Sequence, residues 1–322
     1  MEEWFTKLLE KYFPAQLQEK IKNYLKGSSQ QCKLEEIRLR ANRPAMLVFS
    51  DKDEILNYQV ELNDLQKVMS LISENSVYSY QHEINRGFIT VTGGHRVGIV
   101  GRTYLKSGEI QTIRDVSGIN FRIAREIKGA GKKLVDKLID KRINSFLNTL
   151  LIGPPGCGKT TILRDLTRLL STGNKSFDRT FKITLIDERS EISGSVRGIP
   201  QKEIGLRTDV LDGCPKAKGM MMAVRAMSPE IIVTDEIGTK EDINAVKEAM
   251  NSGVKLLLSI HGDSYETLLK RPGIPELLHD GAIEKLVILS RRRGPGTIET
   301  IRDNKNVLKQ SSNENKKLTV NI

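Results

Sequence analysis

The chain has 322 residues, 38% of them hydrophobic, and a net charge of +11. A length of this size exceeds one usual hydrophobic core, so we expect two domains. No apolar run approaches the roughly 20 residues of a membrane span, and Met1-Glu2-Glu3 lacks the basic start of a secretory signal. The three cysteines show no CxxC spacing, which favours a reducing compartment. We therefore expect a cytosolic protein.

The first part of the chain mixes helical and extended patterns, which predicts an α+β domain at residues 1–125. Helices are expected at 4–12, where apolar residues fall on one side, and at 61–73. Alternating apolar residues predict strands at 34–40, 45–49, 87–91, 95–102 and 118–125. The basic, glycine-containing stretch 126–145 is interpreted as a linker or hinge.

Residues 146–301 predict an α/β domain with a mostly parallel sheet flanked by helices. Apolar runs typical of buried parallel strands occur at 146–152, 182–187, 231–234 and 255–260. Between the first two runs, helical spacing begins at Ile162 and ends at Thr172-Gly173. The tail at 302–322 is polar enough to be disordered.

A phosphate-binding loop follows the first of these strands. Gly156 and Gly158 permit the turn that directs backbone N–H groups at phosphate oxygens, and Lys159 reaches the β- and γ-phosphates. A strand before the loop and a helix after it complete an anion site. The predicted nucleotide-binding residues are Gly153, Pro154, Pro155, Gly156, Cys157, Gly158, Lys159, Thr160 and Thr161.

Two acids end the strand at 231–234, where open α/β sheets place their ligands. Asp235 is expected to act with the Thr160 hydroxyl at Mg²⁺. Glu236 is the candidate general base that polarises the attacking water. The alternative is that this pair caps the next helix, but Thr239-Lys240-Glu241-Asp242 is a better capping sequence.

Two further features point to hydrolysis. The strand at 182–187 runs into Asp187-Glu188, and an extra strand with an acidic pair is the pattern of motor-type P-loop ATPases. His261 ends the strand at 255–260, where a neutral imidazole could donate a hydrogen bond to the γ-phosphate. The alternative for His261 is a simple loop-capping role.

Taken together, these motifs resemble the secretion-type ATPases of type II and type IV secretion and pilus systems. The match extends over both domains, and within that superfamily the chain is similar to the stage III sporulation AA family of endospore-forming bacteria. The runs that carry the closer resemblance are 36–40, 93–98, 186–192 and 234–239.

This resemblance implies a RecA-like ATPase domain, ATP and Mg²⁺ as ligands, and assembly into a ring, expected to be a hexamer. It assigns Asp187-Glu188 to an acidic box near the nucleotide and His261 to a histidine box. Arg96 and Arg122 match arginines that reach phosphate when the N-terminal domain closes. The expected partner is a membrane-embedded sporulation channel, approached from the mother-cell cytosol by a peripherally associated protein. Three departures are Asp235 in place of a glycine found in many secretion ATPases, the absent zinc-binding cysteine tetrad, and Gly262 in place of a threonine.

Two other functions stay open. The basic charge is compatible with a nucleic-acid-dependent translocase or loader, although aromatic residues are only 5% and are not interleaved with the basic clusters. The second open function is a scaffold that binds nucleotide to control assembly and has little turnover. The arginine that acts across a subunit boundary also stays open among Arg96, Arg102, Arg122, Arg125 and Arg225.

Overall fold

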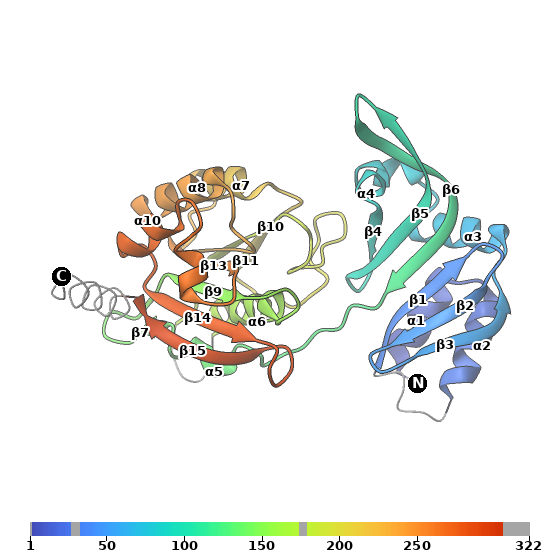
Figure 1. Ribbon diagram of the computed structural model, residues 1–322, viewed down its shortest axis with the longest axis horizontal. Helices are drawn as coiled ribbons and strands as arrows, with labels where there is room; N and C mark the ends of the chain where they lie inside the picture. The colour runs from blue at the N-terminus through green and yellow to red at the C-terminus, as the bar shows by residue number, and fades with distance from the viewer. Residues whose placement is uncertain (1, 27–32, 174–178, 305–322) are drawn as a thin grey trace, which may run out of the picture. The chain divides into compact units, whose positions relative to one another are not determined.

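The computed structural model describes residues 2–26, 33–173 and 179–304, and the chain divides into two compact units, Met1–Arg125 and Glu126–Ile322 (Figure 1). Of the tail predicted to be disordered, residues 302–304 are ordered and residues 305–322 lie outside the described part. We describe each unit by itself.

The first unit is an antiparallel sheet covered by helices. Its strand order is β3-β2-β1-β6-β5-β4, and every pair is antiparallel. The strands are β1 (Leu34–Arg40), β2 (Pro44–Phe49), β3 (Asp53–Gln59), β4 (Phe88–Val91), β5 (His95–Lys106) and β6 (Glu109–Arg122). The helices are α1 (Glu3–Tyr12), α2 (Ala15–Leu25), α3 (Leu62–Ile72) and α4 (Gln81–Asn85), with the 3-10 turn η2 (Val77–Tyr80).

One core holds this unit together. Phe5 and Leu9 of α1 and Leu17 of α2 are buried with Leu47 and Phe121 of the sheet. Burying such side chains stabilises the fold by about 1.5–3 kcal/mol each. The apolar face predicted for the first helix therefore packs on the sheet. The β5–β6 hairpin extends past this core (Figure 1).

The second unit is a seven-stranded sheet between two layers of helices. Its strand order is β11-β10-β12-β13-β9-β14-β15, and all neighbours are parallel except β14 and β15. The strands are β9 (Thr149–Gly153), β10 (Ile183–Asp187), β11 (Thr208–Asp212), β12 (Ile231–Thr234), β13 (Lys255–His261), β14 (Lys285–Ser290) and β15 (Thr297–Asp303). A separate small pair is β7 (Ile139–Asp140) with β8 (Ser145–Phe146). The helices are α5 (Lys132–Val135), α6 (Lys159–Thr172), α7 (Lys216–Ala226), α8 (Lys240–Asn251), α9 (Tyr265–Leu268) and α10 (Ile274–His279).

Side chains of the central strands enter two different cores. Leu150 and Ile152 of β9 belong to the core that includes α7 and α8, whereas Leu151 between them belongs to the core that includes α5 and α6. Alternation along a strand sends neighbours to opposite faces, so a sheet covered on both faces needs apolar residues at every position. The prediction of an α/β fold with a mostly parallel sheet is confirmed.

Several elements differ from the sequence expectations. The run 146–152 is broken, because β8 ends at Phe146 and β9 begins at Thr149. In the stretch predicted as a linker, Leu134 and Val135 of α5 are fully buried in the core with α6. The second unit therefore begins well before residue 146.

Candidate nucleotide site

The predicted phosphate loop joins β9 to α6. Gly156 and Gly158 have φ of 67° and 93°, a left-handed conformation that glycine adopts without steric cost. Lys159 Nζ donates hydrogen bonds to the carbonyl oxygens of Gly153 at 2.6 Å and Pro154 at 2.9 Å. The ammonium is thereby held over the start of the loop, while α6 directs its first N–H groups to the same place.

Cys157 takes part in this loop through its backbone. Its side chain is fully buried in the core beneath the loop, and a Cβ on Gly153 would approach Cys157 Sγ to 2.5 Å. Gly153 is therefore needed for close packing. The Cys157 thiol is directed away from any ligand of the loop.

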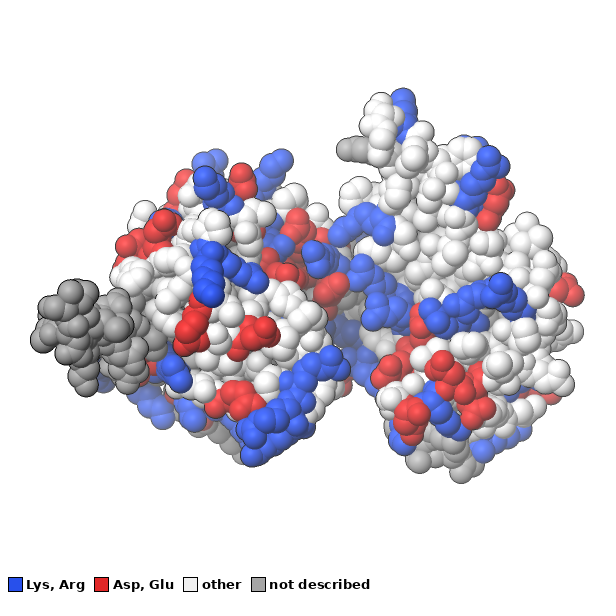
Figure 2. All heavy atoms as spheres, in the orientation of Figure 1, with Lys and Arg blue, Asp and Glu red and all other residues white. Residues whose placement is uncertain are grey.

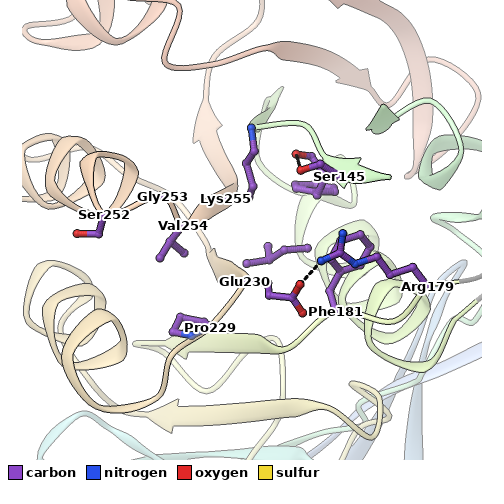
Figure 3. A pocket seen from close by; sticks show the side chains of 11 residues that line it. Ser145, Arg179, Phe181, Pro229, Glu230, Ser252, Gly253, Val254 and Lys255 are labelled. Carbon is purple, nitrogen blue, oxygen red and sulfur yellow. Dashed lines mark hydrogen bonds and ion pairs between the residues drawn. The ribbon is translucent and has the colours of Figure 1, made fainter. Parts of the chain in front are cut away.

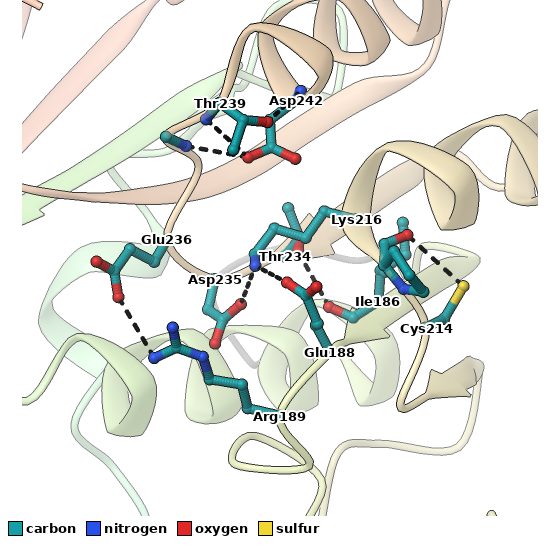
Figure 4. Close-up of polar contacts among 12 residues, drawn as sticks. Ile186, Glu188, Arg189, Cys214, Lys216, Thr234, Asp235, Glu236, Thr239 and Asp242 are labelled. Carbon is teal, nitrogen blue, oxygen red and sulfur yellow. Dashed lines mark hydrogen bonds and ion pairs between the residues drawn. The ribbon is translucent and has the colours of Figure 1, made fainter. Parts of the chain in front are cut away.

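Asp235 follows β12 and is nearly buried. Its Oδ1 has no hydrogen-bond partner among the described residues, and Lys216 Nζ lies 3.7 Å away (Figure 4). Burial disfavours the carboxylate, Lys216 partly offsets this, and Asp187 and Glu191 add repulsion, so the pKa of Asp235 is raised to about 6. A buried carboxylate oxygen without a hydrogen bond suits a cation or its water.

Glu236 is the more accessible of the two acids, with 43% of its side chain exposed. Its nearest cation is Arg189, whose Nη1 lies 4.0 Å from Oε2 (Figure 4). The backbone N–H of Glu236 donates to Ser259 Oγ at 3.1 Å, which fixes this residue to β13. The arrangement leaves a carboxylate able to accept a proton from water at the sheet edge.

Capping of α8 does not require these acids. Thr239 Oγ1 accepts from the N–H of Asp242 at 3.1 Å, and Asp242 Oδ2 accepts from the N–H of Thr239 at 3.1 Å. This is a complete capping box. The prediction that Thr239 begins the helix is confirmed.

Lys216 is a site residue that none of the sequence motifs indicates. Its ammonium lies between Glu188 and Asp235, and its side chain is only 8% exposed (Figure 4). Burial lowers the pKa of Lys216, but the contacts with Glu188 and Asp235 outweigh this and raise it. One signal was available, because a lysine at the first position of a helix opposes the helix dipole.

Asp187 holds the loop that follows β10, and the expectation that the Asp187-Glu188 pair lies near the nucleotide stays a prediction. Both oxygens of its fully buried carboxylate accept backbone N–H groups, from Glu191 at 2.9 Å and from Ser193 at 2.8 Å. Ser193 Oγ donates to the same carboxylate at 2.6 Å. Of these two acids, Glu188 is the one that makes an ion pair with Lys216.

His261 ends β13 and is paired in register with Gly153, the first residue of the phosphate loop. The N–H of Gly262 donates to the carbonyl of Gly153 at 3.4 Å. His261 is thus at the edge of the sheet that carries the loop, and its hydrogen bond to phosphate stays a prediction.

Arg96 and Arg122 belong to the first unit. They are directly paired on β5 and β6, and the Arg96 guanidinium lies 3.6 Å from the centre of the Phe88 ring, a cation–π contact. Their predicted contact with phosphate would join the two units and stays a prediction.

The residues present fit Mg²⁺ bound together with a nucleotide. Within the described residues, no group of three or more His, Cys, Asp or Glu side chains could hold a metal alone. Mg²⁺ in nucleotide sites needs only one or two protein ligands, since phosphates and waters supply the rest. Thr160, at the start of α6, and the Asp235 oxygen without a hydrogen bond meet that need.

A pocket of about 270 Å³ lies at the other edge of the sheet, where β12 and β13 begin (Figure 3). An ion pair between Arg179 and Glu230 crosses it. Ligands of open α/β sheets bind at the carboxyl ends of the strands, so this pocket is separate from the phosphate loop.

Comparison with known proteins identifies the family. The sequence model of the family described as "Sporulation stage III, protein AA" matches residues 13–308. The chain belongs to this family. Stage III sporulation protein AA of Bacillus subtilis (strain 168) is 44% identical over 289 residues, which cover 89% of this chain and 93% of that protein.

Several solved structures have a fold similar to that of this chain. The pilus retraction motor PilT with bound ADP has a TM-score of 0.54 at 14% identity, covering 79% of this chain and 74% of that chain. The ATPase DotB of Yersinia pseudotuberculosis has a TM-score of 0.55 at 14% identity, covering 86% and 76%. At such identities the likeness establishes a secretion-ATPase-like fold. In the part of the chain that the structure describes, no helix has the length and apolarity to cross a membrane.

Proposed function

We propose that this chain is an ATPase that uses Mg²⁺-ATP and turns hydrolysis into conformational work. One observation carries the proposal: β9, which leads into the phosphate loop, and β12, which leads into Asp235 and Glu236, are separated only by β13 in a parallel sheet. Parallel strands bring their carboxyl ends to one edge. Phosphate-binding, metal-binding and proton-accepting groups therefore meet there.

The chain's own residues supply the steps. Lys159 and the N–H groups of the loop bind the phosphates and stabilise the charge that spreads over the transferring phosphoryl group. Glu236 accepts a proton from the attacking water, whose oxygen bonds to the γ-phosphorus. The bond between the γ-phosphorus and the bridging oxygen of ADP breaks, and ADP and phosphate are released. Thr160 and Asp235 would hold Mg²⁺, which neutralises phosphate charge. Arg96 and Arg122 would add positive charge when the first unit closes.

The biological setting rests on family membership and on the likeness to secretion ATPases. We propose a ring-forming subunit, expected to be a hexamer, that docks from the mother-cell cytosol on a membrane-embedded sporulation channel. Closure with ATP and opening on phosphate release would drive that partner. The mass of the assembly, measured with and without ATP, tests the ring: a nucleotide-stabilised hexamer supports it and a persistent monomer contradicts it.

The phosphate loop is tested by Lys159→Ala. Removing a charge-assisted hydrogen bond worth about 1.5–3 kcal/mol should weaken ATP binding roughly ten- to a hundredfold. Lys240→Ala, at the exposed start of α8, is the matched control and should bind normally. Unchanged affinity in the Lys159 variant would contradict the assignment.

The general base is tested by Glu236→Gln. The variant should bind ATP with normal affinity but hydrolyse it about 10²- to 10⁴-fold more slowly, because the amide cannot accept the proton. Glu241→Gln makes the same chemical change at an exposed position of α8 and should keep full turnover. Normal turnover by the Glu236 variant removes it from this role.

The net charge of +11 favours a second candidate, a nucleic-acid-dependent translocase. On the face seen in Figure 2, however, acidic side chains are interspersed with the basic ones. DNA and RNA added to the ATPase assay separate the functions. A translocase would be stimulated, with binding that weakens steeply as salt rises, whereas the proposed secretion-type motor should not respond.

A further inference from the structure

The phosphate loop lies against a second segment, the turn 291–296 between β14 and β15. The N–H of Gly296 donates to the carbonyl of Cys157 at 2.7 Å. A Cβ on Gly158 would approach Gly296 N to 2.8 Å, and one on Gly156 would lie 3.7 Å from Arg291 Nη1. Both loop glycines therefore face this turn.

Strand pairing explains the contact. β14 runs parallel to β9, with Ile288 opposite Ile152, so both strands end at the same edge of the sheet. The segment that follows β14 must then begin beside the segment that follows β9. Figure 1 shows the β14–β15 hairpin next to β9 and α6.

The three arginines of the turn differ in their contacts. The Arg292 guanidinium makes a two-point ion pair with Glu299, with Nε and Nη2 each 3.0 Å from a carboxylate oxygen. The backbone of Arg293 donates to Thr297 Oγ1 at 3.3 Å. Arg291 is exposed, and in the described part of the chain it has no acidic partner within ion-pair distance. Its guanidinium is instead placed against Gly156.

We propose that Arg291, at the start of the turn 291–296, is part of the nucleotide site and binds the diphosphate of the nucleotide held in the phosphate loop. This inference rests on the proposed function. A guanidinium presents paired N–H donors that match two phosphate oxygens. Glycine at position 156 leaves the space between the guanidinium and the loop backbone free of any side chain.

The position of Arg291 also predicts which nucleotides should bind more weakly when this arginine is removed. Lys159 lies at the start of α6, whereas Arg291 approaches the loop at Gly156, on the strand side of that lysine. A phosphate bound by the loop N–H groups is present in ADP as well as in ATP. Loss of Arg291 should therefore weaken both nucleotides by a similar factor.

Arg291→Ala is the test, with ADP and ATP affinities measured by calorimetry on the full chain. Both dissociation constants should rise about tenfold or more. Arg292→Ala is the matched control, because that side chain already pairs with Glu299, and its affinities should stay within about twofold. Arg291→Lys should recover part of the loss, since it keeps the charge without the planar fork.

Several results would overturn the inference. They are an Arg291→Ala variant that binds both nucleotides like the wild type, a loss confined to ATP, or an equal loss in Arg292→Ala, which would indicate only a general charge effect. A thermal melt of each variant confirms that the fold is kept. If Lys159→Ala weakens binding and Arg291→Ala does not, this inference fails and the proposed function stands. If the wild type binds no nucleotide, both fail.

Discussion

At the residue scale, Lys216 holds two carboxylates, Glu188 and Asp235, close together. A carboxylate that is almost buried is costly unless a cation compensates it. Lys216 supplies that cation to Asp235 and contacts Glu188 at the same time. The acid assigned to Mg²⁺ is therefore held in place by a lysine from a different element, the start of α7.

Lys216→Met should destabilise the protein by about 1–3 kcal/mol, because the buried carboxylate of Asp235 loses its counter-charge. Adding Asp235→Asn in the same chain should restore most of that loss. Urea unfolding of the wild type, both single variants and the double variant measures the coupling. Additive effects, or a stable Lys216→Met variant, would contradict the pairing.

The residues of the site fall into two groups: those that belong to a short sequence motif and those that do not. Lys159, Asp235 and Glu236 were predicted because each belongs to a short run that combines strand, turn and polar group. Arg291 was not, since it reaches the site only through the pairing of β14 with β9. Lys216 was not either, because its one signal is a lysine at the start of a helix. No spacing in the sequence reveals that β14 lies beside β9.

At the element scale, α6 does more than begin at the phosphate loop. Its Asp165 is buried and accepts a hydrogen bond from the N–H of Gly131 at 2.8 Å, and Arg168 donates to the other oxygen at 2.7 Å. This contact ties the entry segment of the second unit to the helix that carries Lys159. It explains why part of the predicted linker is packed structure.

Asp165→Ala should lower the free energy of unfolding at neutral pH by about 1–3 kcal/mol, because the N–H of Gly131 loses its partner. Burial alone would raise the pKa of Asp165, but hydrogen bonds from Arg168 and the backbone of Gly131 and Gly129 outweigh it and lower the pKa. The stabilisation is therefore complete above the ordinary carboxyl range and is lost as pH falls through the lower folded value.

Denaturation curves measured from neutral pH to below about pH 4 check this dependence. The gap between wild type and Asp165→Ala should close as the solution becomes acidic. Asp280→Ala removes an exposed ion pair with Lys247 and should change stability little at any pH. A gap that is constant with pH would contradict a role for the charge.

Other elements show where sequence patterns succeed. Strands such as β12, with apolar residues at nearly every position, were predicted because two covered faces demand them. β11 (Thr208–Asp212) was missed, since it is a half-exposed strand at the end of the sheet with aspartates at its second and last positions. α7 was missed as well. Its apolar face contains glycine and methionine in place of a regular leucine stripe.

At the scale of the whole molecule, the first unit has one core and the second unit has two, and each core is made of residues from a single unit. The phosphate loop, Asp235, Glu236, Lys216 and Arg291 all lie in the second unit, whereas the candidate arginines Arg96 and Arg122 lie in the first. Nucleotide binding and full hydrolysis should therefore be separable.

A fragment spanning residues 126–322 should bind ADP as tightly as the full chain but hydrolyse ATP at least about tenfold more slowly, because it lacks the arginines of the first unit. Calorimetry and phosphate release measure the two properties. The full chain with Arg96→Ala and Arg122→Ala together is the matched comparison and should show the same slow turnover. Full activity in either protein would exclude these arginines from catalysis.

The strand order has a consequence for folding during translation. β9 is synthesised early in the second unit, yet its two neighbours in the sheet, β13 and β14, end only at His261 and Ser290. Pairings of such long sequence separation form late. During translation the phosphate loop therefore emerges long before the strands that support it. A nascent chain would therefore complete the proposed nucleotide site only after the β14–β15 hairpin has left the ribosome.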